Sequence, residues 1–294
     1  MRIRAFLFAI LFLAPVAASA QALPWYCWNT PDDELIPVIL FENKPSDRRM
    51  DPLVSLLKDC GWTDDKIFYI RVFLPVFPFI CNEDTAVDIR NAIQGVVNAT
   101  GYDHVDVLGY SLQAMTVRYA ISALGGWEQV RNVVLWGSPN NGGSNLLLTG
   151  WCYLDQLAPN TDFVRCTNGD AFGEPGCANP FDTATPHARQ PGDPVEDGVL
   201  YVNMYSKDDL LMSASELLLH DDAVNLEFPV VPHGNYPDDP RVQNETIGAF
   251  VGKVVPHNCG SLPAGRANVG AALWVLAGMA PLGWIARRRR GVSS

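Results

Sequence analysis

The sequence predicts an α/β fold, with a mostly parallel central sheet and helices on both of its faces. Apolar strand patterns alternate with helical patterns from residue 35 onward, as parallel strands joined by helices require. The chain has 294 residues, of which 48% are hydrophobic, which is enough for a substantial core. A Gly-x-Ser sequence also marks a sharp joint between one strand and the next helix. In such sheets, ligands bind beyond the carboxyl ends of the strands.

Each element is expected from its own pattern. The first half of the chain predicts strand 35–41, helix 51–60, strand 66–73, helix 83–98, strand 104–109, helix 112–124 and strand 132–136. Strand patterns resume at 199–205 and 224–231, and a last helix is expected at about 240–254. Each predicted strand is short and apolar, as expected for strands covered on both faces.

A long insertion interrupts this alternation at about 142–197. The segment is rich in Gly, Pro, Asn, Asp and Cys, so we expect a lid-like covering over the sheet. The chain has seven cysteines, at positions 27, 60, 81, 152, 166, 177 and 259. No Cys-x-x-Cys pair occurs, so disulfides are favoured over a metal site. The spacing leaves the pairing open, with Cys259 the expected unpaired thiol.

Both ends of the chain carry targeting patterns. Residues 1–20 have a basic start, an apolar run and the ending Ala18-Ser19-Ala20, which predicts a signal peptide before a domain at 21–260. After a linker at 261–268, residues 269–286 are uncharged and precede four arginines in a basic tail at 287–294. This pattern predicts a transmembrane helix with a cytoplasmic tail. It also resembles bacterial sorting signals that a membrane protease removes.

These ends predict an exported protein, either periplasmic or at the cell surface, anchored in the membrane unless the tail is cleaved. Its charge is strongly asymmetric. Residues 21–260 hold all 32 acidic residues but only 14 of the 21 basic ones, which leaves a net charge of about −18. Such a surface repels nucleic acid, which we therefore exclude as a partner, and a neutral or apolar substrate fits better. We expect no cofactor and no metal.

The Gly-x-Ser joint predicts a nucleophile at Ser111. The strand at 104–109 runs directly into the helix at 112–124, with Ser111 between them. Gly109 leaves room for the sharp turn, which exposes the serine hydroxyl above the sheet. The start of the helix offers backbone N–H groups to a developing negative charge. This arrangement is typical of a nucleophile elbow.

With this joint, the chain resembles the secreted bacterial lipases of the alpha/beta-hydrolase superfamily, especially the small triacylglycerol lipases. The resemblance extends over roughly residues 35–255. It is carried by the elbow, Arg118-Tyr119, Gly125-Gly126, and the sequence Val-Arg-Asn-Val-Val-Leu-Trp-Gly-Ser-Pro-Asn-Asn-Gly-Gly at 130–143. It implies the alpha/beta-hydrolase fold and hydrolysis of carboxylic esters.

The family's chain order is serine, then acid, then histidine, because the serine needs a base and the base needs an orienting acid. His233, in the loop after the last predicted strand, has the position of the base. The other histidines precede the serine or lie in other settings: His104, His187, His220 and His257. For the acid, Asp209 aligns better with the family pattern than its neighbour Asp208. Either aspartate could instead cap a helix beginning near Leu210.

Two positions depart from the family pattern. The first predicted strand ends in Glu42-Asn43 where these lipases carry His-Gly. The Lys44 N–H has the position of one oxyanion donor, and the Leu112 N–H is the expected second donor. Asn43 could also supply a side-chain donor. Gln113 replaces a small glycine and could face the pocket and bind substrate, or it could widen the elbow.

We therefore expect an ester hydrolase that acts on lipid or other apolar acyl esters through an acyl-serine intermediate. The insertion would supply the acyl-binding wall through its large side chains, namely Trp151, Tyr153, Leu154 and Phe163. Two alternatives stay open. One is a weak or inactive hydrolase-like protein that binds a partner at the cell surface. The other is an acyltransferase that uses the same three residues.

Overall fold

The computed structural model describes residues 27, 30–42, 49–72, 80–144, 150–169, 198–219 and 223–254. The predicted signal peptide, linker, C-terminal helix and basic tail lie outside these residues, as do Asn43 and Lys44. Within the described ranges, no helix combines the length and apolar character needed to cross a bilayer.

A parallel sheet of six strands forms the centre of the described structure, in the order β2-β1-β3-β4-β5-β6. The strands are β1 (Val38–Glu42), β2 (Ile67–Arg71), β3 (Val105–Tyr110), β4 (Val130–Trp136), β5 (Leu200–Tyr205) and β6 (Val224–Glu227). Tyr110 of β3 pairs with Trp136 of β4, which pairs with Met204 of β5. Because these strand ends are level, the loops that follow them start at one shared edge.

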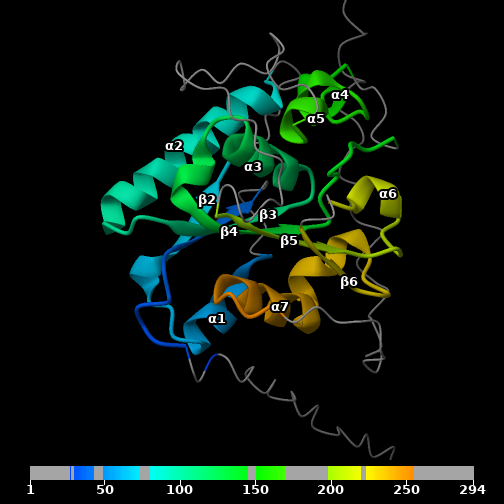
Figure 1. Cartoon of the computed structure of the whole chain (residues 1–294). Helices are drawn as coiled ribbons and strands as arrows, with labels where there is room; N and C mark the ends of the chain where they lie inside the picture. The colour runs from blue at the N-terminus through cyan, green and yellow to red at the C-terminus, as the bar shows by residue number, and fades with distance from the viewer. Residues whose placement is uncertain are drawn as a thin grey trace, which may run out of the picture.

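Helices cover both faces of the sheet (Figure 1). On one face lie α2 (Asn82–Thr100) and α3 (Leu112–Ser122), and on the other α1 (Asp51–Asp59) and α7 (Pro240–Phe250). The strands alternate accordingly, since Ile39 packs in the core with α2 and α3, whereas Leu40 packs with α1 and α7. The predicted α/β architecture is confirmed.

Several predicted elements end earlier than their apolar patterns suggested, most of all β6 and α7. Strand β6 stops at Glu227, although Phe228 N–H still donates to the Tyr205 carbonyl over 2.7 Å. Pro229 then offers no N–H to continue the ladder, and Val230 adopts a left-handed conformation with φ 63°. Helix α7 ends at Phe250, shortly before Gly252 with φ 65°.

The described part of the insertion, residues 150–169, forms two short helices on the α3 side of the sheet (Figure 1). These are α4 (Cys152–Asp155) and α5 (Asp162–Thr167). Other short helices are η2 (Asp64–Lys66), η3 (Gly126–Gln129), α6 (Ala214–Leu217) and η5 (His233–Asp238). Disulfides join Cys27 to Cys60 and Cys81 to Cys152, and Cys166 is also disulfide-bonded. The predicted use of cysteines for disulfides is therefore confirmed.

Candidate active site

Ser111 lies in a strained turn between β3 and α3. Its backbone angles are φ 59° and ψ −137°, a conformation that costs a residue with a side chain roughly 1–3 kcal/mol. Its N–H donates to the Trp136 carbonyl over 2.8 Å, which fixes the turn to the end of β4. A Cβ at Gly109 would lie 2.7 Å from the Ala114 Cα. The absent side chain at Gly109 therefore allows α3 to fold back closely on β3.

His233 and Asp209 form a chain of hydrogen bonds with this serine. The Ser111 Oγ lies 2.7 Å from the His233 Nε2, and the His233 Nδ1 lies 2.7 Å from the Asp209 Oδ2. Asp209 follows β5 and His233 begins η5 after β6, so neighbouring strands deliver both residues to the edge where Ser111 lies. The Asp209 carboxylate has 0% exposure and the His233 side chain 11%, so water competes little for these bonds.

The two adjacent aspartates have different partners. The Asp209 Oδ1 accepts from the Leu211 N–H over 3.0 Å, so this carboxylate caps a turn and contacts His233 at the same time. The Asp208 Oδ2 instead accepts from the Val230 N–H over 2.7 Å. Asp208 thus fastens the loop after β5 to the loop before His233. The helix expected near Leu210 begins later, as α6 at Ala214.

Two tyrosines enclose the His233 ring. The Tyr110 ring stacks on it with centroids 5.7 Å apart and planes 24° apart, and the Tyr236 ring meets it edge-on at 6.1 Å. The Tyr110 hydroxyl donates to the His233 carbonyl over 2.6 Å. Burial raises the pKa of Tyr110 well above its usual range, so this donor keeps its proton. The tyrosines therefore restrict both the backbone and the ring of His233.

Gly137, the first residue after β4, leaves the space that the His233 ring occupies. A Cβ there would lie 3.3 Å from the His233 Cε1 and Nδ1 and 3.0 Å from the Tyr236 Cε2. The backbone of Gly137 also has φ 52°, which a residue with a side chain adopts only with strain.

We predict that Gly137→Ala lowers kcat for a simple ester by up to about a hundredfold, because the added methyl group displaces the His233 ring. Gly101→Ala is the matched control: Gly101 has φ 75° with no atom within 4 Å of the added Cβ. Both variants are expected to lose about 1–2 kcal/mol of unfolding free energy from backbone strain. Steady-state kinetics and thermal unfolding separate the two effects. Equal kcat in both variants would contradict the role assigned to this space.

The possible oxyanion donors are only partly within the described structure. Leu112 is the first residue of α3, and no described residue accepts a hydrogen bond from its N–H, as is usual for the first N–H groups of a helix. Lys44 and Asn43 lie outside the described residues. Glu42 ends β1 with its side chain buried, at 5% exposure. Gln113 is fully buried, and its side-chain amide has no hydrogen-bond partner in the described part of the chain.

The structure thus brings Ser111, His233 and Asp209 together, with Leu112 beside the serine. Their catalytic roles, and substrate binding by Gln113 or Asn43, stay predictions. Sequence reasoning missed the surroundings of the base, which are Tyr110, Gly137 and Tyr236. Two of these had a signal, since Tyr110 is the middle residue of the Gly-x-Ser sequence and Gly137 opens the Gly-Ser-Pro turn.

Solved structures with related architecture include two lipases. Lipase B of Aspergillus fumigatus superposes with a TM-score of 0.52 at 16% identity, covering 73% of this chain and 52% of the lipase. Lipase BlEst2 of Bacillus licheniformis, in its propeptide form, gives a TM-score of 0.52 at 12% identity, and the match covers 80% of this chain and 54% of the lipase chain. The chain has the alpha/beta-hydrolase fold.

This alpha/beta-hydrolase fold agrees with the family resemblance seen in the sequence. The chain spans about half the length of the two lipases. No protein-family model and no curated protein sequence matches it. The likeness therefore establishes the fold, and the chemistry has to be argued from the site itself.

Proposed function

We propose that this protein is a carboxylic ester hydrolase that works through an acyl-serine intermediate on Ser111. The observation that carries the proposal is the hydrogen-bonded chain from Ser111 through His233 to Asp209, with both contacts at 2.7 Å. Serine nucleophile, histidine base and orienting carboxylate are the groups that acyl transfer needs. The alpha/beta-hydrolase fold, shared with lipases, supports ester hydrolysis as the reaction.

In the acylation step, the Ser111 Oγ attacks the carbonyl carbon of the ester while the His233 Nε2 takes the hydroxyl proton. The carbonyl electron pair moves onto oxygen, and the Leu112 N–H stabilises that negative charge together with the Lys44 N–H. The bond to the alcohol oxygen then breaks, and His233 donates its proton to the leaving alcohol. Asp209 accepts from Nδ1 throughout, which keeps the imidazole in the required orientation.

Deacylation repeats these steps with water in place of the serine. His233 removes a proton from water, the hydroxide attacks the acyl carbon, and Ser111 leaves with the proton returned from His233. The products are a carboxylic acid and an alcohol, and the protein is unchanged. An acyltransferase would differ only in using another alcohol or amine as the acceptor.

We further propose that the substrate is a lipid or other apolar ester and that the protein acts after export, anchored by its C-terminal segment. The net charge of about −18 over residues 21–260 favours an uncharged substrate. The signal-like pattern at 1–20 and the apolar segment at 269–286, followed by arginines, support export and anchoring.

A fluorophosphonate probe tests the proposed function directly. We expect one adduct, on Ser111, found by mass spectrometry of the digested protein, and no adduct in the Ser111→Ala variant. A folded wild-type protein that stays unlabelled would contradict the enzyme and favour the non-catalytic binding protein. Product analysis with added alcohols then separates hydrolysis from acyl transfer. Hydrolysis products that do not decrease as the alcohol concentration rises would exclude the acyltransferase.

A further inference from the structure

The described part of the insertion is fastened to the helix that follows Ser111. We propose that the disulfide Cys81–Cys152, together with Asn82 and Gln156, forms a clamp that holds this segment as a fixed acyl-binding wall. The clamp would act as a positioning device that sets selectivity for acyl chain length. This inference rests on the proposed ester hydrolase function and adds a determinant of its specificity.

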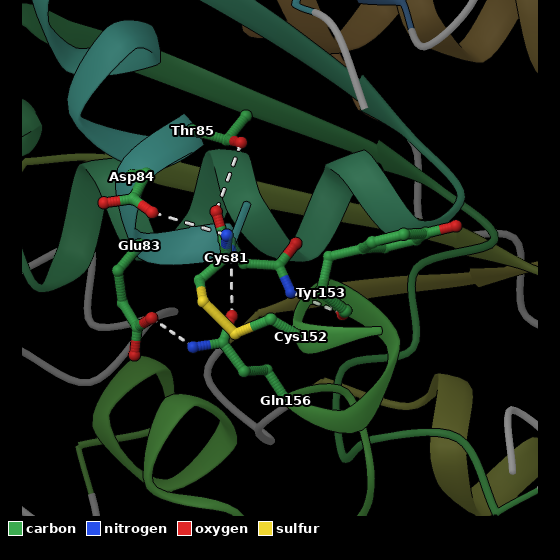
Figure 2. Close-up of a disulfide and its surroundings, with 8 residues drawn as sticks. Cys81, Glu83, Asp84, Thr85, Cys152, Tyr153 and Gln156 are labelled. Atoms are coloured by element: carbon green, nitrogen blue, oxygen red, sulfur yellow. Dashed lines mark hydrogen bonds between the residues drawn. A yellow bond between two sulfur atoms is a disulfide. The ribbon is translucent and has the colours of Figure 1, made fainter. Parts of the chain in front are cut away.

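The disulfide is the covalent part of the clamp. It joins the residue before α2 to the first residue of α4, which lie 71 positions apart in the sequence with their Cα atoms 5.0 Å apart (Figure 2). Helix α2 packs on the sheet and on α3, so Cys81 is held by the core of the domain. Residues 150–169 are thereby tied to a rigid element by a covalent bond.

Asn82 connects the insertion to the helix of the nucleophile. Its side chain is 1% exposed, and its Nδ2 donates to the Tyr153 carbonyl over 2.6 Å. Its Oδ1 accepts from the Thr116 hydroxyl over 3.0 Å, and Thr116 lies on α3, five positions after Ser111. One buried side chain therefore links α4 to the helix whose first residue offers the Leu112 N–H. Moving α4 away would deprive the Asn82 Nδ2 of its hydrogen-bond acceptor, which is costly for a buried donor.

Gln156 completes the clamp on the outer side. The Asn82 N–H donates to the Gln156 Oε1 over 2.6 Å. The Gln156 Nε2 donates to the Glu83 carboxylate (Figure 2). One of the free N–H groups at the start of α2 is thus capped by a side chain from the insertion. Such caps typically contribute about 1 kcal/mol.

A second set of contacts holds the other end of residues 150–169. The Phe163 ring of α5 stacks on Tyr119 of α3 with centroids 4.7 Å apart. The guanidinium of Arg118, which is fully buried, donates to the Asn168 Oδ1 over 2.8 Å. Burial lowers the pKa of Arg118 to about 10, which still leaves it charged at neutral pH. With one end fastened to the start of α2 and the other packed on α3, this segment is built as a wall rather than as a hinged lid.

The clamp also leaves apolar surface exposed beside it. Ile80 and Trp151, which directly precede the two cysteines, are 38% and 37% exposed. They lie among the few large hydrophobic side chains that the described structure leaves exposed. Binding an acyl chain requires apolar protein surface of this kind in a fixed position.

The test removes the clamp disulfide and measures selectivity. In the variant Cys81→Ala with Cys152→Ala, we expect the KM for p-nitrophenyl octanoate to rise relative to that for the acetate. The expected rise is about fourfold for each methylene group that loses its cover. The kcat for the acetate should stay close to that of the wild type, because the acetate does not reach the wall.

The matched control is the variant Cys27→Ala with Cys60→Ala. This disulfide joins the N-terminal segment to the residue after α1, on the opposite face of the sheet. Both deletions are expected to lower thermal stability, and only removal of the clamp should change the KM ratio. An unchanged ratio in the clamp variant, or the same change in both variants, would overturn the proposal.

Two further measurements separate failure of the clamp from failure of the proposed function or of folding. Fluorophosphonate titration of Ser111 counts the folded, competent sites, so a wild-type protein that is not labelled contradicts the proposed function and not the clamp alone. If the double variant is not labelled, Gln156→Ala replaces it, since this change removes two hydrogen bonds and keeps the disulfide. We expect a smaller rise of the same KM ratio in Gln156→Ala, and an unchanged ratio would overturn the clamp.

Discussion

Replacing His233 with alanine is expected to lower kcat on a p-nitrophenyl ester by roughly 10⁴-fold to 10⁶-fold. The Ser111 hydroxyl would lose the only group within hydrogen-bond reach, among the described residues, that accepts its proton, at 2.7 Å. The Leu112 N–H and the binding surface would remain, so a small residual rate is expected. Active-site labelling of Ser111 should fall in parallel, since phosphonylation needs the same base.

The matched control for this variant is His104→Ala. His104 is an exposed residue just before β3, at the edge of the sheet opposite the site. It should keep the wild-type kcat, and both variants should keep the circular dichroism spectrum of the parent protein. Turnover by His233→Ala at the wild-type rate would refute the assignment of the base.

The fold was predictable because two independent sequence patterns, the alternation of elements and the alternation of residues within strands, indicate the same architecture. Apolar strands alternate with helical patterns, and residues such as Ile39 and Leu40 face opposite sides of the sheet in agreement with the period of a strand. The boundaries were harder to predict. The run after β6 continues through Val231, whereas the strand ends before Pro229, which has no N–H, and Val230, which adopts a left-handed backbone.

The candidate site was predictable where chain order limits the choice. A serine at a strand-to-helix joint, followed by an acid and a histidine after later strands, leaves few candidates in this chain. Their closeness then follows from parallel strands that end at one edge. The choice between Asp208 and Asp209 depends on which carboxylate meets the His233 Nδ1, and this is a tertiary property.

The remaining features depend on contacts between distant segments. The spacing of the cysteines left their pairing open, whereas the fold pairs Cys152 with Cys81, at a sequence separation of 71. The roles of Gly137 and Tyr110 depend on how closely the His233 ring approaches β4 and β3. A single sequence carries no direct record of such distances, because they result from packing of the whole domain.

Asp209→Asn is expected to lower kcat by about 10⁴-fold, although the side chain keeps its size and place. The reason lies in the second contact of the carboxylate. The Asp209 Oδ1 accepts from the Leu211 N–H, so an asparagine places its carbonyl oxygen there and turns its NH₂ group toward the His233 Nδ1. The imidazole then carries its proton on Nε2. A protonated Nε2 cannot accept the proton of the Ser111 hydroxyl.

The neighbouring substitution, Asp208→Asn, provides the control in the same loop with the same change of charge. The Asp208 carboxylate binds the Val230 N–H and does not contact His233. An asparagine oxygen can still accept that hydrogen bond, so kcat should change by less than about tenfold. Steady-state kinetics of both variants on one p-nitrophenyl ester measure the difference. A larger loss of kcat in Asp208→Asn than in Asp209→Asn would assign the orienting acid to Asp208. Comparable small losses in both would mean that His233 is oriented mainly by Tyr110 and Tyr236, which hold its backbone and its ring.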